Sequence, residues 1–151
     1  ALAAERFDQM LGYALDTLET ALPWNKILPA REHILAAMQD GLSQENEIVL
    51  VFSHISHVYT NGGSLYITYL FRRAMDPEQT LSRWQKIKSA ASQQIMTYGG
   101  TITHQHGIGL DHKPYLAKEK GALGMRIIAD MVKDIDPHQV MNIGKLIETD
   151  Y

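Results

Sequence analysis

The stretch Thr60-Asn61-Gly62-Gly63 decides the fold, because it separates two runs of strand-forming residues. Residues 47–59 are rich in Ile, Val and Phe, which predicts a buried strand. Asn-Gly readily adopts the positive φ angles of a tight turn, so the sequence predicts a β-hairpin here. The second run, residues 64–71, alternates and has an apolar face formed by Leu65, Ile67, Tyr69 and Phe71.

A strand and a helix are expected before this hairpin, and a helix and a strand after it. Residues 13–19 alternate like a strand, and Pro29 suits the first turn of a helix that runs to about residue 42. Asp76 and Pro77 are typical of the start of a helix, here one that reaches about residue 98. A short strand is expected over residues 100–103. The order is therefore β-α-β-β-α-β.

This order indicates an α+β domain of the split βαβ, or ferredoxin-like, type. Its four-stranded antiparallel sheet carries helices on one face, and residues 1–151 form a single domain. Further helices are expected over residues 2–11, 113–119 and 121–133, the last two forming a helical C-terminal tail.

Composition excludes several classes of function for the 151-residue chain. Its net charge of −3 gives no electrostatic reason to expect nucleic acid as a partner. No apolar run reaches the roughly 18 to 20 residues that a membrane span needs. The absence of cysteine excludes disulfides and thiolate chemistry, and is compatible with a cytoplasmic location. A position peripheral to a membrane stays open.

The most reactive stretch runs from Gly99 to Gly109 and contains two histidines. In an extended strand, His104 and His106 would project from one face, and the glycines around them allow close approach of a ligand. Imidazoles can donate, accept or ligate near neutral pH. By the same periodicity, His54 and His57 would face opposite sides, while His57 would share a face with Tyr59. A strand end with two exposed histidines is the non-functional alternative.

Four segments together resemble one family, the C-terminal domain of FAD-linked oxidases of the vanillyl-alcohol-oxidase type. It includes alkyldihydroxyacetonephosphate synthase, glycolate oxidase subunits and D-lactate dehydrogenases. The resemblance implies that a separate N-terminal domain binds most of the FAD. The present chain would be the distal part of the cap, which covers the flavin ring and contacts the substrate. The four segments are residues 18–24, 56–66, 99–109 and 136–145.

The metal-dependent branch of that family has a His-x6-His pair on the hairpin and a Glu before the later His-Gly. The corresponding residues here are Tyr59, Tyr66 and Gln105, whose neutral side chains are weak ligands for a divalent ion. No metal site is therefore expected from the resemblance. A site built on His104 and His106 is a separate alternative.

The alkyldihydroxyacetonephosphate synthase branch has a tyrosine at the position of Tyr59 and a His-His-His-Gly run, which here reads His104-Gln105-His106-Gly107. This resemblance implies non-redox flavin chemistry, in which a fatty alcohol replaces the acyl chain of the substrate in ether-lipid synthesis. It implies catalytic roles for Tyr59, His104 and His106. We expect His57 and Gln105 to contact the substrate. Asn142 matches the family's Asn-Pro-Gly-Lys ending and is the expected cofactor contact.

Other functions and assemblies remain open. The alternatives are an FAD-dependent dehydrogenase for 2-hydroxyacids such as glycolate or D-lactate, or for glycerol phosphate, working without a metal, and a non-catalytic split βαβ binding module. The expected partner is a small-molecule substrate, with a phosphorylated or lipid-like one as an option. A homodimer is also open.

The chain by itself is expected to bind no FAD. No glycine-rich segment suited to a pyrophosphate occurs near its start, and a cap makes only some of the flavin contacts. The visible absorption spectrum of the purified 151-residue protein tests this. A yellow protein with a stable flavin spectrum would contradict it.

Overall fold

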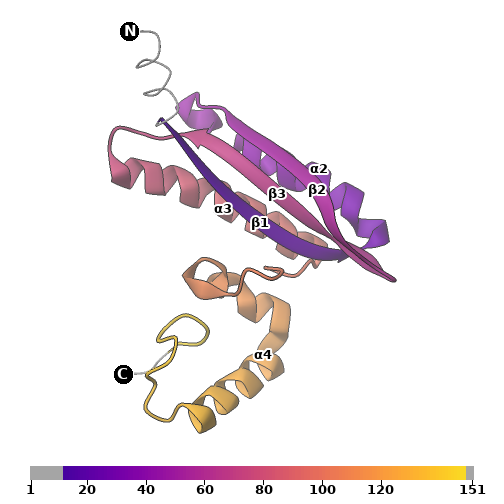
Figure 1. Cartoon of the computed structure of the whole chain (residues 1–151), viewed down its shortest axis with the longest axis vertical. Helices are drawn as coiled ribbons and strands as arrows, with labels where there is room; N and C mark the ends of the chain where they lie inside the picture. The colour runs from indigo at the N-terminus through magenta and orange to yellow at the C-terminus, as the bar shows by residue number, and fades with distance from the viewer. Residues whose placement is uncertain (1–11, 149–151) are drawn as a thin grey trace.

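The computed structural model describes residues 12–148 and contains one antiparallel sheet with helices on one side (Figure 1). The helix expected over residues 2–11 lies outside the described residues. The elements are β1 (Tyr13–Pro23), α2 (Trp24–Asp40), a 3₁₀ turn (Ser43–Glu45), β2 (Val49–Tyr59), β3 (Gly62–Arg72), α3 (Pro77–Tyr98) and α4 (Gly109–Ile135).

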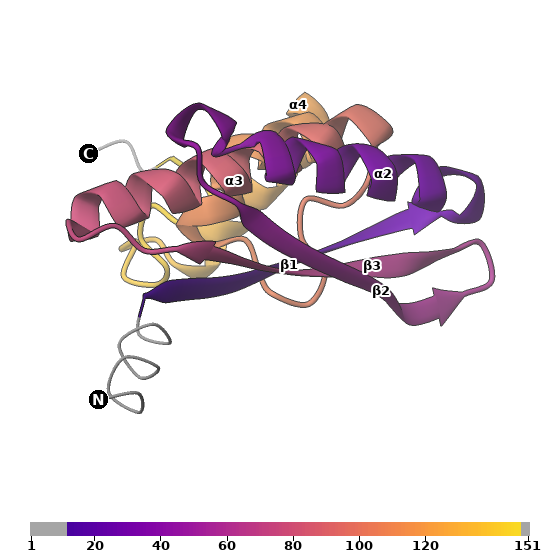
Figure 2. The same cartoon turned by 90° about the horizontal axis from the view of Figure 1, so that it is seen from above.

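The sheet has the strand order β1-β3-β2, so the hairpin strand β3 is central and both neighbours are edge strands. Figure 2 shows α2 and α3 packed on one face of the sheet, while no helix within residues 12–148 covers the other face. The predicted α+β fold, with an antiparallel sheet and helices on one face, is confirmed. We call the uncovered side the open face.

The short strand expected over residues 100–103 is wrong. Within residues 12–148 the sheet has three strands, and residues 100–108 form irregular backbone that we call the histidine loop. Gln105 and Gly107 have φ angles of 64° and 77°, which an extended strand does not allow. Only Thr101 pairs with β1, through a hydrogen bond from its N–H to the carbonyl of Ala21.

The hairpin between β2 and β3 is confirmed, but its glycine serves another purpose than the one expected. Neither Asn61 nor Gly62 has a positive φ angle. A Cβ on Gly62 would instead lie 2.2 Å from the carbonyl oxygen of Leu22, on the neighbouring strand β1. Glycine is required here because the end of β1 crosses so close to the hairpin.

The expectation that β2 is a buried strand is wrong as well. Because β2 lies at an edge of the sheet, its alternate residues reach the open face and remain exposed. Leu50 and Phe52 are exposed to 50% and 58%. An all-apolar run predicts a strand equally well at the edge or in the centre of a sheet, so the sequence pattern does not distinguish the two.

Helix boundaries follow the sequence signals only in part. Asp76 caps α3 by accepting a hydrogen bond from the N–H of Glu78, as expected. However, α2 begins at Trp24, five residues before Pro29. The break predicted between two tail helices occurs at Gly121, whose φ of 69° and ψ of 172° kink α4.

None of the helices in the described part of the chain is long and apolar enough to cross a membrane.

A polar cluster lies between the sheet and α3, at the margin of the hydrophobic core, with the side chain of Asp16 33% exposed. Asp16 on β1 accepts hydrogen bonds from Tyr69, Trp84 and Lys88, the last at 2.9 Å. The sequence pattern places Lys88 at the margin of the helix face, but its side chain is buried. Burial raises the pKa of Asp16, but the hydrogen bonds from Trp84 and Lys88 outweigh it and hold the pKa below its usual 3.8.

Asp16→Ala is expected to lower the free energy of unfolding at neutral pH by about 2 kcal/mol, because it leaves the buried ammonium of Lys88 without its carboxylate. The native pKa of Asp16 lies below its ordinary value of 3.8. Its contribution is therefore complete above that pH and is lost as the pH falls through the native pKa. Chemical denaturation between neutral and acidic pH measures both effects.

The matched control is Lys86→Ala. Lys86 lies on α3, like Lys88, and its exposed side chain pairs with Glu45. This substitution should cost less than about 1 kcal/mol, as exposed ion pairs do. Equal losses in the two variants would show that the cluster around Asp16 contributes no more than a surface pair.

Candidate functional site

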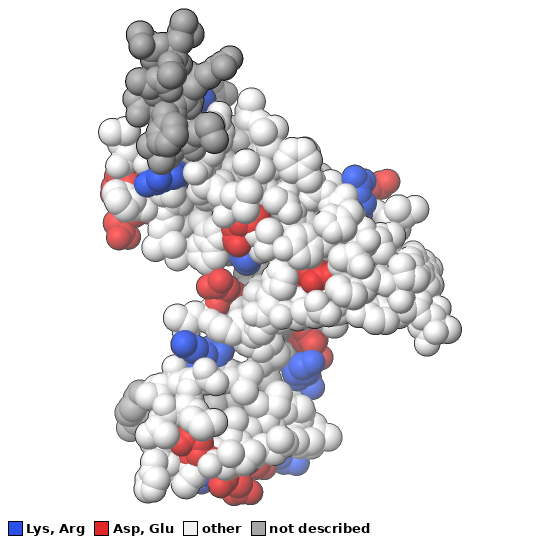
Figure 3. All heavy atoms as spheres, in the orientation of Figure 1, with Lys and Arg blue, Asp and Glu red and all other residues white. Residues whose placement is uncertain are grey.

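The candidate site lies on the open face, where the histidine loop crosses the ends of β1, β3 and β2. Strand register places Glu19 of β1 opposite Tyr66 of β3, and His57 of β2 opposite Ser64 of β3. All four side chains face away from α2 and α3, because the alternate residues form the core. Figure 3 views this face and shows few charged side chains over the strands.

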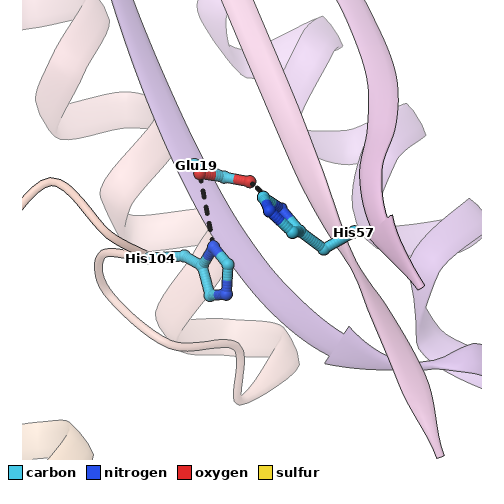
Figure 4. A group of neighbouring side chains, drawn as sticks. All are labelled: Glu19, His57 and His104. Atoms are coloured by element: carbon cyan, nitrogen blue, oxygen red, sulfur yellow. Dashed lines mark ion pairs between the residues drawn. The ribbon is translucent and has the colours of Figure 1, made fainter. Parts of the chain in front are cut away.

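Glu19 is the centre of the site, and Figure 4 shows two imidazoles directed at its carboxylate. Its side chain is 2% exposed. His57 Nδ1 lies 3.4 Å from Oε1, and His104 Nδ1 lies 3.3 Å from Oε2. His106 Nε2 is 3.7 Å from Oε2. Three histidines from two separate segments therefore surround one buried carboxylate.

The carboxylate of Glu19 is held in its ionised form. Burial alone raises its pKa, but hydrogen bonds from Ser56 and Ser64 and the nearby imidazole of His104 outweigh that effect and lower the pKa to about 2. Ser56 Oγ donates a short hydrogen bond to Oε1 and lies 2.7 Å from Ser64 Oγ. The site thus contains a fixed negative charge near neutral pH.

A β-bulge gives Ser56 and His57 their positions. The register between β2 and β3 shifts between Ile55 and His57, so Ser56 is an extra residue on the edge strand. The shift puts His57 on the open face together with His54, which stacks on Tyr66 with ring centroids 5.3 Å apart. The expectation that His54 and His57 face opposite sides is therefore wrong, because it assumed a regular strand.

The histidine loop is fixed to the end of β1 by Thr101. Its Oγ1 accepts a hydrogen bond of 2.8 Å from the N–H of Ala21, and its carbonyl accepts one of 2.7 Å from Thr20 Oγ1. A Cβ on Gly100 would lie 2.5 Å from Thr20 Oγ1, so only glycine allows the loop to come this close. These contacts bring His104 over Glu19.

The structure brings together five of the six predicted site residues. Tyr59 Oη lies 2.9 Å from His104 Nε2, and Gln105 Nε2 lies 3.4 Å from His57 Nε2. His106 packs edge-on against Tyr66, with ring centroids 5.7 Å apart. A phenol held by an imidazole that faces a carboxylate is an arrangement suited to acid–base chemistry.

Asn142, the sixth residue, lies elsewhere. It sits in the C-terminal tail with a φ of 50°, beside the last turns of α4. There it lines a cavity of about 660 Å³ between α4 and the tail, and none of the five converging residues lines that cavity. The tail is tied to the start of α4 by Lys113 Nζ, which donates to the carbonyl of Gly144.

Sequence reasoning missed Glu19, Ser56 and Ser64 as site residues. Side chains alternate along a strand, so Glu19 lies on the face opposite to that of the core residue Leu18. A carboxylate among the apolar residues of this strand is a readable signal for a buried acid on that other face. The bulge at Ser56 leaves no comparable mark in the sequence.

Residues 1–146 match the family model "FAD linked oxidases, C-terminal domain". The chain belongs to this family. An alkyldihydroxyacetonephosphate synthase from Trypanosoma brucei brucei is 26% identical over 132 residues, covering 87% of the chain and 21% of the relative. A D-2-hydroxyglutarate dehydrogenase from Xanthomonas citri pv. viticola is 30% identical over 101 residues, covering 67% of the chain and 20% of the relative.

A solved alkyldihydroxyacetonephosphate synthase shares the fold of this FAD-linked oxidase C-terminal domain. The TM-score is 0.57 with 20% sequence identity, over 89% of the chain and 21% of that structure. The chain thus spans about a fifth of the length of the relatives it matches. The predicted family membership is confirmed.

Thr101→Val is expected to loosen the histidine loop, because it leaves the N–H of Ala21 without its acceptor. The loss should be about 1–2 kcal/mol of unfolding free energy. Hydrogen exchange of residues 101–106 should become faster. Thr97→Val is the control, since the exposed Thr97 hydroxyl bonds only within α3. Unchanged exchange in the Thr101 variant would show that other contacts hold the loop.

Proposed function

We propose that this domain is the substrate cap of an FAD-dependent enzyme that exchanges an acyl for an alkyl group, as in alkyldihydroxyacetonephosphate synthase. The observation that carries the proposal is the contact of 2.9 Å between Tyr59 Oη and His104 Nε2, with His104 in turn facing Glu19. The similarity to the trypanosomal synthase over 87% of the chain supports the same branch.

The side chains on the open face suit a surface that covers the flavin ring better than one that binds the whole cofactor. The open face offers aromatic and apolar side chains, Leu50, Phe52 and Tyr66 among them, which can lie against a planar ring and exclude water. When bound, the flavin supplies the reactive ring against which the substrate carbon is held. Asn142 in the tail is the proposed contact of this chain with the cofactor.

The side chains of the site then have separate tasks. Tyr59 passes its phenol proton to His104 Nε2, and its phenolate oxygen then removes a proton from the carbon beside the substrate carbonyl. His106, with its side chain 30% exposed, contacts the departing carboxylate of the acyl chain. His57 and Gln105 position the polar part of the substrate on the side of β2.

A second candidate is an FAD-dependent 2-hydroxyacid dehydrogenase, favoured by the 30% identity to a D-2-hydroxyglutarate dehydrogenase. In that reaction the same tyrosine and histidines would bind the hydroxyl and carboxylate of the acid. The two candidates differ in whether electrons leave the substrate.

Turnover assays separate the two candidates. The polypeptide that carries this chain in the cell, purified with its flavin, is incubated with D-lactate, glycolate or D-2-hydroxyglutarate and an artificial electron acceptor. A parallel reaction contains acyl-dihydroxyacetone phosphate and a fatty alcohol. Alkyl product without acceptor reduction supports the alkyl exchange, whereas acceptor reduction by a hydroxyacid supports the dehydrogenase and overturns it.

His106→Ala in the same polypeptide is expected to lower turnover by about 10² or more, since a positioned acid, base or charge-stabilising donor contributes roughly 10² to 10⁴ in rate. His33→Ala should leave turnover unchanged, because His33 lies exposed on α2 and contacts only Pro29 and Tyr98. Flavin content and unfolding curves confirm that both variants fold. Wild-type turnover by a folded His106 variant would make this residue structural.

A further inference from the structure

We propose that Glu19, His57 and His104 form a binding site for a divalent transition-metal ion of the zinc type. One carboxylate oxygen of Glu19 and one ring nitrogen of each histidine lie within 4.8 Å of one another, and Figure 4 shows the three side chains. The inference does not depend on the proposed function, because metal binding is measured without substrate.

The distances within the cluster suit a tetrahedral ion better than hydrogen bonds. Oε2 of Glu19 lies 3.3 Å from His104 Nδ1, and the other carboxylate oxygen, Oε1, lies 3.4 Å from His57 Nδ1, so each imidazole faces its own oxygen. Hydrogen bonds to a carboxylate are usually shorter, at about 2.7–2.9 Å. Two donor atoms bound at about 2.0–2.1 Å to a tetrahedral zinc ion lie about 3.3 Å apart. A small inward movement of the side chains completes the site.

His104 Nδ1 is a buried atom that has no hydrogen-bond partner in the structure. A buried ring nitrogen without a partner costs free energy, whether it is protonated or not. It lies 3.3 Å from Glu19 Oε2, so an ion bound between the two atoms would satisfy it.

The charge of the cluster also calls for a cation. Glu19 is a buried carboxylate, and its ion-pair partners among the described residues are His57, His104 and His106, all of them imidazoles. Asp16, by contrast, pairs with the amino group of Lys88 at 2.9 Å. Only a proton on an imidazole or a bound metal ion can neutralise Glu19 in this setting.

The far nitrogens of both proposed histidine ligands are already held by side chains. His57 Nε2 lies 3.4 Å from the amide of Gln105, and His104 Nε2 lies 2.9 Å from Tyr59 Oη. Metal-binding histidines nearly always have such a partner, which fixes the ring and the tautomer. With Nδ1 on the ion, the Nε2–H of His104 would donate to Tyr59 Oη.

The proposed ligands differ from those of the family's metal-dependent branch. The positions of that branch correspond to Tyr59, Tyr66 and Gln105, where the sequence analysis expects no metal ligand. In the proposed site, Tyr59 and Gln105 instead contact the Nε2 atoms of the two histidines, on the side away from the ion. The fourth position of the ion is left for water or substrate, as in catalytic zinc sites.

The test uses the purified protein after treatment with a chelator and dialysis. Titration with Zn²⁺ by calorimetry should show one ion per chain, and Co²⁺ should give the visible absorption of a tetrahedral complex with nitrogen and oxygen ligands. Bound Zn²⁺ should raise the thermal midpoint, because it binds the native state.

His57→Ala and Glu19→Gln should each weaken Zn²⁺ binding by more than about 10²-fold, since loss of an outer partner alone typically costs 10–100-fold. His57 is 41% exposed, so its variant tests the site even where Glu19→Gln fails to fold. His54→Ala is the matched control on the same strand and face. An absence of Zn²⁺ binding to the wild-type protein, or equal affinity in the His57 and His54 variants, would overturn the proposal.

Discussion

The arrangement of the open face depends on one buried charge, the carboxylate of Glu19. An ionised carboxylate cannot remain out of water without hydrogen bonds and a nearby cation. Ser56 and Ser64 supply the hydrogen bonds from the hairpin, and the imidazoles of His57, His104 and His106 lie within 3.7 Å of the carboxylate oxygens. The irregular features of this domain, the bulge in β2 and the non-extended histidine loop, are the features that bring those groups to the carboxylate.

Each irregularity carries a local cost that the contacts at Glu19 offset. The bulge at Ser56 leaves one residue of an edge strand outside the regular ladder, where the loss is smallest. Gln105 adopts a positive φ angle, which costs a residue with a side chain of the order of 1–3 kcal/mol. Strain of this kind persists only where surrounding contacts fix it, and here Thr101 and Gly100 dock the loop against β1.

The regular elements of the fold could be predicted from the sequence, because their signals are local. The β2–β3 hairpin and the cap of α3 by Asp76 arise from neighbouring residues, and both are confirmed. The start of α2 and the exposed position of β2 depend on what packs against them, which no local pattern records. For the site, the resemblance led to Tyr59 and His104, and these residues do converge. Glu19 was missed although its face of the strand is readable from the sequence, whereas the bulge and the loop that surround it are set by long-range packing and leave no local signal.

The two acidic residues of β1 lie on opposite faces of the sheet and have different partners. Asp16 and Glu19 are three residues apart, so a regular strand turns them to opposite faces of the sheet. On the helix side, Asp16 pairs with Lys88 and accepts hydrogen bonds from Tyr69 and Trp84, so this cluster ties β1 to α3. On the open face, the ion-pair partners of Glu19 among the described residues are imidazoles, a type of side chain that can also bind a metal ion. A carboxylate surrounded by imidazoles can bind a metal ion together with them, whereas a carboxylate paired with lysine cannot. That difference in partners is the reason we propose chemistry at Glu19 and a structural role for Asp16.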